Sequence, residues 1–127
     1  MTFKLSERSL GKMEGLHEDL IKVIHEAIKV TPHDFGITEG LRSVSRQKEM
    51  VRKGLSKTMA SRHLTGKAFD ICIYINGKVT WENKYYEEVA QRVLAVSSRL
   101  MIPLTWGGSW KDFRDDVHFE LDRKHYK

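Results

Sequence analysis

Features that cross-link, anchor or divide a protein are scarce in this sequence. It has one cysteine, Cys72, and two prolines in 127 residues, which excludes an internal disulfide and favours synthesis in a reducing compartment. No apolar run approaches the roughly 20 residues of a membrane-spanning helix, and the first residues lack the apolar segment of a secretory signal. Repeats and low-complexity linkers are also missing. We therefore expect one domain over residues 1–127, with no membrane insertion.

Charged residues are more abundant and their balance is basic. Lys and Arg number 22 against 17 Asp and Glu, for a net charge of +5. This balance favours an anionic partner, such as nucleic acid, a lipid surface or an anionic polymer of the cell wall. Basic residues crowd residues 42–53, but Glu49 interrupts them and no nucleic-acid-reading element is evident. A nucleic-acid partner is therefore not expected.

Apolar residues recur at helical spacing in two long segments. Residues 16–30 and residues 84–100 each carry a stripe at three-and-four spacing, which predicts two amphipathic helices. A shorter helix is expected to start at Ser43 or Ser45, either of which can cap it, and to run toward Gly54.

Strand signals occupy the segments between these helices. Residues 68–75 alternate, with Phe69, Ile71, Ile73 and Ile75 on one face, and we expect that face to be core. Asn76-Gly77 is a hairpin signal. Helices packed on a small antiparallel sheet, an α+β fold, are the predicted architecture. The other expected strands are residues 34–40, 78–81, 102–106 and 117–121.

Two of these strands carry a polar residue where a neutral one is expected. Asp70 lies among isoleucines, and His118 lies between Val117 and Phe119. Burying either group is costly unless it is paired or bound to a cation, so one shared metal ion would satisfy both. His63 supplies a second imidazole seven residues before Asp70. Three such ligands leave a fourth position for water, as in catalytic zinc sites; the alternative is a solvated His63, an ion-paired Asp70 and a capped His118.

The same residues lie in two motifs that carry a family resemblance. Ser61-x-His63-x-x-Gly66-x-Ala68-x-Asp70 and Asp115-x-x-His118-x-Glu120 resemble the zinc peptidases that comprise D-Ala-D-Ala carboxypeptidases and phage L-alanyl-D-glutamate peptidases. The likeness extends over nearly the whole chain and is greatest for compact phage endolysins. It is also carried by residues 35–43, 74–78 and 106–108.

This resemblance implies a metal centre and a substrate. It implies one zinc ion per chain, held by His63, Asp70 and His118, and bacterial peptidoglycan as the partner. It further implies a catalytic domain without a separate wall-binding module, acting as a monomer. Such enzymes are made in the host cytoplasm and reach the cell wall when a holin opens the inner membrane.

The resemblance also implies roles for residues around the metal. Asp115 would be the catalytic acid and base, and its position three residues before His118 favours it over the adjacent Asp116. Arg42 would stabilise the oxyanion or clamp a substrate carboxylate, and Ser61 would bind the substrate backbone. Glu120 shares the metal face and would either orient a ligand or be a solvated charge. Ser109 departs from the acidic residue of many phage members, which puts one loop contact in doubt.

Several functions remain open on the sequence. The leading expectation is a peptidoglycan endopeptidase that cuts the L-Ala-D-Glu bond through a metal-activated water. A D,D-carboxypeptidase that trims terminal D-Ala is the alternative within the family. A non-catalytic wall-binding domain would keep the core but lose ligands or base, and all four are present in this chain. A basic nucleic-acid-binding domain is the remaining alternative.

Overall fold

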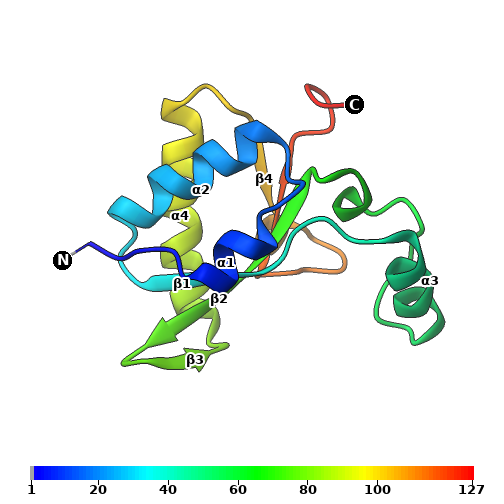
Figure 1. The fold of residues 1–127 in the computed structure, drawn as a ribbon, viewed down its shortest axis with the longest axis horizontal. Coiled ribbons are helices and arrows are strands. Elements are labelled where there is room, and N and C mark those ends of the chain that lie inside the picture. The colour runs from blue at the N-terminus through cyan, green and yellow to red at the C-terminus, as the bar shows by residue number, and fades with distance from the viewer. Residues whose placement is uncertain (1) are drawn as a thin grey trace.

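The computed structural model describes residues 2–127 and consists of helices packed on a small antiparallel sheet (Figure 1). This is the α+β architecture expected from the sequence. No helix within the described residues is long and apolar enough to cross a membrane. In chain order the elements are α1 (Glu7–Lys12), α2 (Glu18–Val30), β1 (Asp34–Glu39), α3 (Val44–Arg52), the 3-10 helix η1 (Arg62–Thr65), β2 (Ala68–Ile75), β3 (Lys78–Thr80), α4 (Asn83–Arg99), β4 (Leu104–Trp106), the 3-10 helix η2 (Gly107–Ser109) and β5 (His118–Leu121).

The sheet is built around β2. Strand β1 pairs with one edge of β2, and β5 followed by β4 lies beyond the other edge, with every pair antiparallel. Strand β3 follows β2 through the expected hairpin, in which Asn76 and Gly77 both have the positive φ that a two-residue turn of this kind requires. The register pairs Asp70 with His118 on β5 and with Glu39 on β1. Polar residues from three strands therefore meet in the middle of the sheet.

The isoleucine-rich face of β2 forms the core together with α2 and α4, which pack against each other (Figure 1). Ile71 and Ile73 are buried as predicted, whereas Ile75, next to the hairpin, is half-buried. Tyr86 on α4 is buried beneath the sheet, where its hydroxyl accepts a hydrogen bond from the Ile73 amide. Burial of each such side chain contributes roughly 1.5–3 kcal/mol to folding. Cys72 points to the other face of β2 and is also buried, because α1 and the hairpin lie beside it.

Helix α1 is an element that the sequence pattern does not predict. Its six residues are too few to display a helical period, but Ser6 caps it by accepting a hydrogen bond from the Ser9 amide. The Ser9 hydroxyl then accepts a hydrogen bond from the Ile37 amide of β1 at 3.0 Å. Helix α1 thereby covers an amide on the edge of the sheet that would otherwise be unpaired.

The 3-10 helix η1 is fastened to the start of α2 at Gly66. Gly66 ends η1 with a φ of 69°, and its carbonyl accepts a hydrogen bond from the His17 amide at 2.8 Å. A Cβ atom at this position would lie 2.4 Å from the Gly15 carbonyl oxygen, so glycine is required for both conformation and space. This close contact fixes the segment that carries His63 against the body of the fold.

Candidate metal centre and active-site cleft

Three elements bring His63, Asp70 and His118 to one point. His63 lies on η1, Asp70 on β2 and His118 at the start of β5. Asp70 Oδ1 is 3.2 Å from His63 Nε2 and 3.0 Å from His118 Nδ1. One ligand atom from each residue lies within 4.8 Å of the other two, so this group can hold a metal ion. The structure thus brings together the three residues that the sequence motifs relate.

The second nitrogen of each imidazole is also bound to an oxygen. His63 Nδ1 is 2.8 Å from the Gly40 carbonyl oxygen, and His118 Nε2 is 2.9 Å from Glu120 Oε1. A neutral imidazole has one N–H, so it can donate to only one of two acceptors. If the outer nitrogens donate, then His63 Nε2 and His118 Nδ1 present lone pairs toward Asp70. Two lone pairs and a carboxylate facing one another form a donor set that fits a cation, with the outer oxygens orienting the imidazoles.

Burial and hydrogen bonding at this centre together favour ionised groups. Burial works to raise the pKa of Asp70, but hydrogen bonds from His118 and His63 outweigh it and hold this pKa well below its ordinary value. Burial works to lower the pKa of His118, yet hydrogen bonds to Asp70 and Glu120 raise it to about 9. A proton on His118 thereby places a positive charge between the carboxylates of Asp70 and Glu120.

Glu120 is buried behind His118. Its side chain is 4% exposed, and its second oxygen accepts a hydrogen bond from Arg123 Nε at 2.9 Å. Burial works to raise the pKa of Glu120, but the contacts with His118 and Arg123 lower it overall. Of the two expectations for Glu120, contact with a candidate ligand matches this geometry, whereas a solvated charge does not.

Arg42 is buried beside the side chains of His63, Asp70 and His118, here called the metal group, and is not displayed on the surface. Its Nε and Nη2 donate to the two oxygens of Glu39 at 2.6 and 2.8 Å, and its Nη1 donates to Gln47 Oε1 at 2.7 Å. Nη2 also lies 4.0 Å from Asp70 Oδ2, and Nη1 lies 3.5 Å from Ser61 Oγ. The Nε and Nη2 side of the guanidinium is therefore occupied by Glu39 and is not open to a substrate carboxylate.

Glu39 and Gln47 are site residues that the sequence analysis missed. Gln47 is fully buried on α3, and its amide nitrogen donates to Ser56 Oγ and to the Thr58 carbonyl oxygen. It thus joins Arg42 to the segment that follows α3. The available signals were weak, namely an acidic residue three positions before Arg42 and a glutamine in a short polar helix.

Asp115 and Asp116 have different surroundings. Asp115 lines the same cavity as the metal group, and burial, together with the nearby Asp70 charge, raises its pKa. Asp116 accepts hydrogen bonds from Asn83 Nδ2 and Arg114 Nε at 2.7 Å each, at the surface. Of the two carboxylates, Asp115 is the one that faces the cleft.

The loop before Asp115 is held tightly against η2. Asp115 donates its amide to the Gly107 carbonyl oxygen at 3.1 Å, and a Cβ atom on Gly107 would lie 2.4 Å from the Asp115 carbonyl oxygen. Ser109 donates its hydroxyl to the Trp106 carbonyl oxygen at 2.7 Å, so this departure from the family pattern serves the η2 backbone. Trp110 lies beside His118, with ring centroids 5.3 Å apart.

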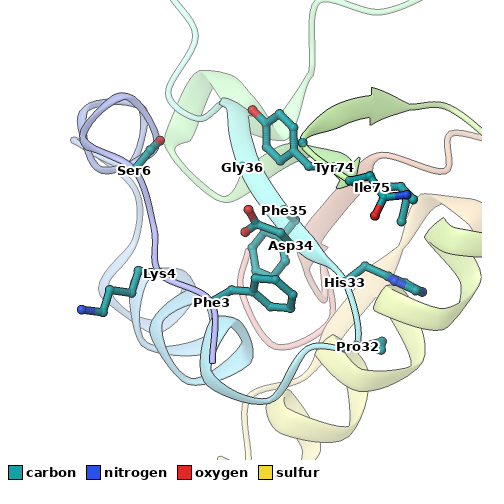
Figure 2. Close-up of a pocket in the computed structure, with 12 residues that line it drawn as sticks. Phe3, Lys4, Ser6, Pro32, His33, Asp34, Phe35, Gly36, Tyr74 and Ile75 are labelled. Carbon is teal, nitrogen blue, oxygen red and sulfur yellow. The ribbon is translucent and has the colours of Figure 1, made fainter. Parts of the chain in front are cut away.

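The cleft above the metal group has a volume of about 330 Å³. Its walls are residues 55–63, which follow α3, and residues 110–118, which precede and begin β5. A larger cavity of about 610 Å³ lies at the far end of β1 and β2, with Phe3, Asp34 and Tyr74 among its lining residues (Figure 2). None of the three candidate ligands lines that larger cavity, so the smaller cleft is the candidate active site.

Two buried histidines and a partly buried aspartate, with a further carboxylate in the same cleft, form an arrangement typical of metal-dependent hydrolases, on an α+β scaffold. The chain belongs to the phage L-alanyl-D-glutamate peptidase family, whose sequence model matches residues 1–127. The family resemblance of the two sequence motifs is thus confirmed.

Three relatives match over most of their own length. The chain is 31% identical to the L-alanyl-D-glutamate peptidase of Escherichia phage T5, covering 99% of this chain and 94% of that protein. It is 29% identical to the peptidoglycan L-alanyl-D-glutamate endopeptidase CwlK of Bacillus subtilis, covering 80% and 71%. Among solved structures, the Serratia marcescens L-Ala D-Glu endopeptidase ChiX superposes with a TM-score of 0.91 at 41% identity, covering 97% of this chain and 93% of that one.

Proposed function

We propose that this protein is a zinc-dependent peptidoglycan peptidase that hydrolyses the L-Ala-D-Glu bond of cell-wall stem peptides. The observation that carries the proposal is the convergence of His63, Asp70 and His118 in a cleft that also contains Asp115. Family membership and three relatives whose names state this activity support the choice of bond. Two imidazoles and one carboxylate are a donor set typical of catalytic zinc, which supports the choice of metal.

Each residue around the cleft has a role in this proposal. His63, Asp70 and His118 would hold one zinc ion, which supplies an acidified water and polarises the scissile carbonyl. Asp115 takes the proton of the attacking water and delivers it to the leaving amine, a task suited to a carboxyl group with a raised pKa.

Neighbouring side chains position the reacting groups. Arg42, held by Glu39, directs positive charge toward the developing oxyanion, and Ser61 offers a hydroxyl to the substrate backbone. Glu120 orients the His118 imidazole so that Nδ1 faces Asp70, where it would serve as the zinc ligand.

The proposal also includes a partner and a biological setting. The proposed partner is bacterial peptidoglycan, and the net charge of +5 attracts the protein to an anionic wall. We propose that the enzyme is a monomer made in the host cytoplasm and that it reaches the wall after a holin opens the inner membrane.

Digestion of purified peptidoglycan tests the proposal. We expect new amino termini on D-Glu, activity that is lost with a chelator and restored by zinc, and about one zinc ion per chain. Release of free D-Ala without new D-Glu termini would identify a D,D-carboxypeptidase instead. Wall binding without any hydrolysis, in protein that contains zinc, would identify a non-catalytic domain.

A further inference from the structure

The two walls of the active-site cleft touch at its rim through Lys57 and Phe113. Lys57 Nζ lies 4.6 Å from the centroid of the Phe113 ring, a cation–π distance. Lys57 follows α3 and Phe113 lies in the loop before β5, so the contact joins segments 56 residues apart in sequence. Both residues line the cleft that contains the metal group.

Phe113 adopts a conformation that its own packing does not explain. Its φ is 55°, in the left-handed region that bulky residues avoid. The side chain is 55% exposed, so burial of the ring does not offset the strain. Strained residues of this kind cluster at sites of binding and catalysis, where the position of the side chain matters. The loop therefore holds an aromatic ring at the cleft rim at a cost in stability.

Lys57 differs from the other cations that line the cleft. Arg42 and Arg123 each bind a glutamate, and Arg62 binds main-chain carbonyl oxygens. Within residues 2–127, no acidic side chain forms an ion pair with Lys57. The ammonium group is thus available to an anion that enters the cleft.

The substrate of the proposed function supplies such an anion. D-Glu joined to L-Ala through its amine carries two carboxyl groups, and the stem peptide continues through only one of them. The second carboxyl group stays on the leaving side of the scissile bond. We infer that Lys57 is the specificity-determining residue that binds this free carboxylate, and that Phe113 is the positioning residue that holds the Lys57 ammonium over the cleft. This inference rests on the proposed function.

Two synthetic stem peptides test the role of Lys57. They differ only in whether the second carboxyl group of D-Glu is free or amidated. We expect the wild-type protein to prefer the free acid by about 3- to 10-fold in kcat/KM, the scale of one charge-assisted contact at a partly exposed site. Lys57→Met should remove this preference by lowering kcat/KM for the free-acid peptide. Lys78→Met, which removes an exposed lysine on β3, should keep it.

Glycine substitutions test the role of Phe113. Phe113→Gly relieves the left-handed strain and should raise Tm by about 2–5 °C while reducing the preference for the acid. Met101→Gly is the matched control, because Met101 has a φ of 61° and is 88% exposed at the end of α4, away from the cleft. It should raise Tm similarly and leave the acid preference unchanged.

The outcomes separate this inference from the function on which it rests. If the wild-type protein cleaves neither peptide nor purified wall, the proposed function fails and the inference fails with it. If it cleaves both peptides equally, or if Lys57→Met keeps the acid preference, only the assignment of Lys57 is overturned. If Phe113→Gly lowers Tm while Met101→Gly raises it, Phe113 is a structural residue and its positioning role is overturned.

Discussion

Replacing Asp115 with asparagine separates the proton-transfer chemistry from the metal site. The amide has nearly the same size and shape as the carboxyl group, but it cannot accept a proton at neutral pH. Asp115 contributes main-chain hydrogen bonds to Gly107 and His118, and the substitution leaves both intact. The side chain lies in the metal cleft but is not one of the three residues that converge as candidate ligands. Asp115→Asn should therefore keep the fold and about one zinc ion per chain.

The expected loss of activity is large and the expected change in stability is small. A general base contributes about 100-fold or more to the rate, which corresponds to about 2.7 kcal/mol of barrier. Burial raises the pKa of Asp115, so its charged form is disfavoured by the fold at neutral pH. Removing that charge should leave the free energy of unfolding unchanged or slightly higher. Activity and stability should consequently move independently.

Asp116→Asn is the matched control in the adjacent position. Asp116 pairs with Arg114 and Asn83 at the surface, so its loss should cost about 0.2–1 kcal/mol of stability and little activity. The assay is release of new amino termini from purified peptidoglycan, with zinc content and Tm measured on the same samples. Full activity in Asp115→Asn would refute the general-base role. Loss of activity in Asp116→Asn alone would move that role by one residue.

Three further predictions concern the site and its support. The first concerns chelator-treated protein, in which folding raises the pKa of His118 from 6.5 to about 9. The stability that the His118 proton contributes is therefore complete below about pH 6.5 and is lost as pH rises through 9. Tm should fall between pH 6.5 and 9.5, and His118→Asn should flatten that profile. Gly66→Ala should cost more than 2 kcal/mol in urea unfolding, against about 1 kcal/mol for Gly77→Ala, whose Cβ would enter open space. Gln47→Leu should raise KM or lower kcat while zinc content stays near one per chain, because the amide that holds Arg42 is lost; an unchanged kcat/KM would contradict this.

Local pattern in the sequence was sufficient for most of the scaffold. Strand alternation identified the buried isoleucine face of β2, and Asn76-Gly77 identified the hairpin, because few residues tolerate the positive φ values of that turn. Helices α2 and α4 were predicted for the same reason, since each has enough turns to display a periodic apolar stripe. Helix α1 and η1 were missed because each is shorter than two helical turns.

The candidate ligands were accessible from sequence for a related reason. Asp70 and His118 are polar residues within apolar strands, and this local conflict marks them without any knowledge of the fold. His63 was tied to them only by the motif, because a histidine in a loop has no such conflict. That these three residues meet is decided by the pairing of β2 with β5 and by the contact of η1 with the start of α2.

What the sequence determined by itself was the set of elements and the residues whose chemistry is out of place within them. Tertiary structure alone decided which side chains contact one another. Arg42 can be buried because Glu39 and Gln47 accept its hydrogen bonds, and Lys57 contacts Phe113 from another part of the chain. The reason is physical, since periodicity and capping act within a few residues, whereas burial, register and ion pairing depend on segments that only folding brings into contact.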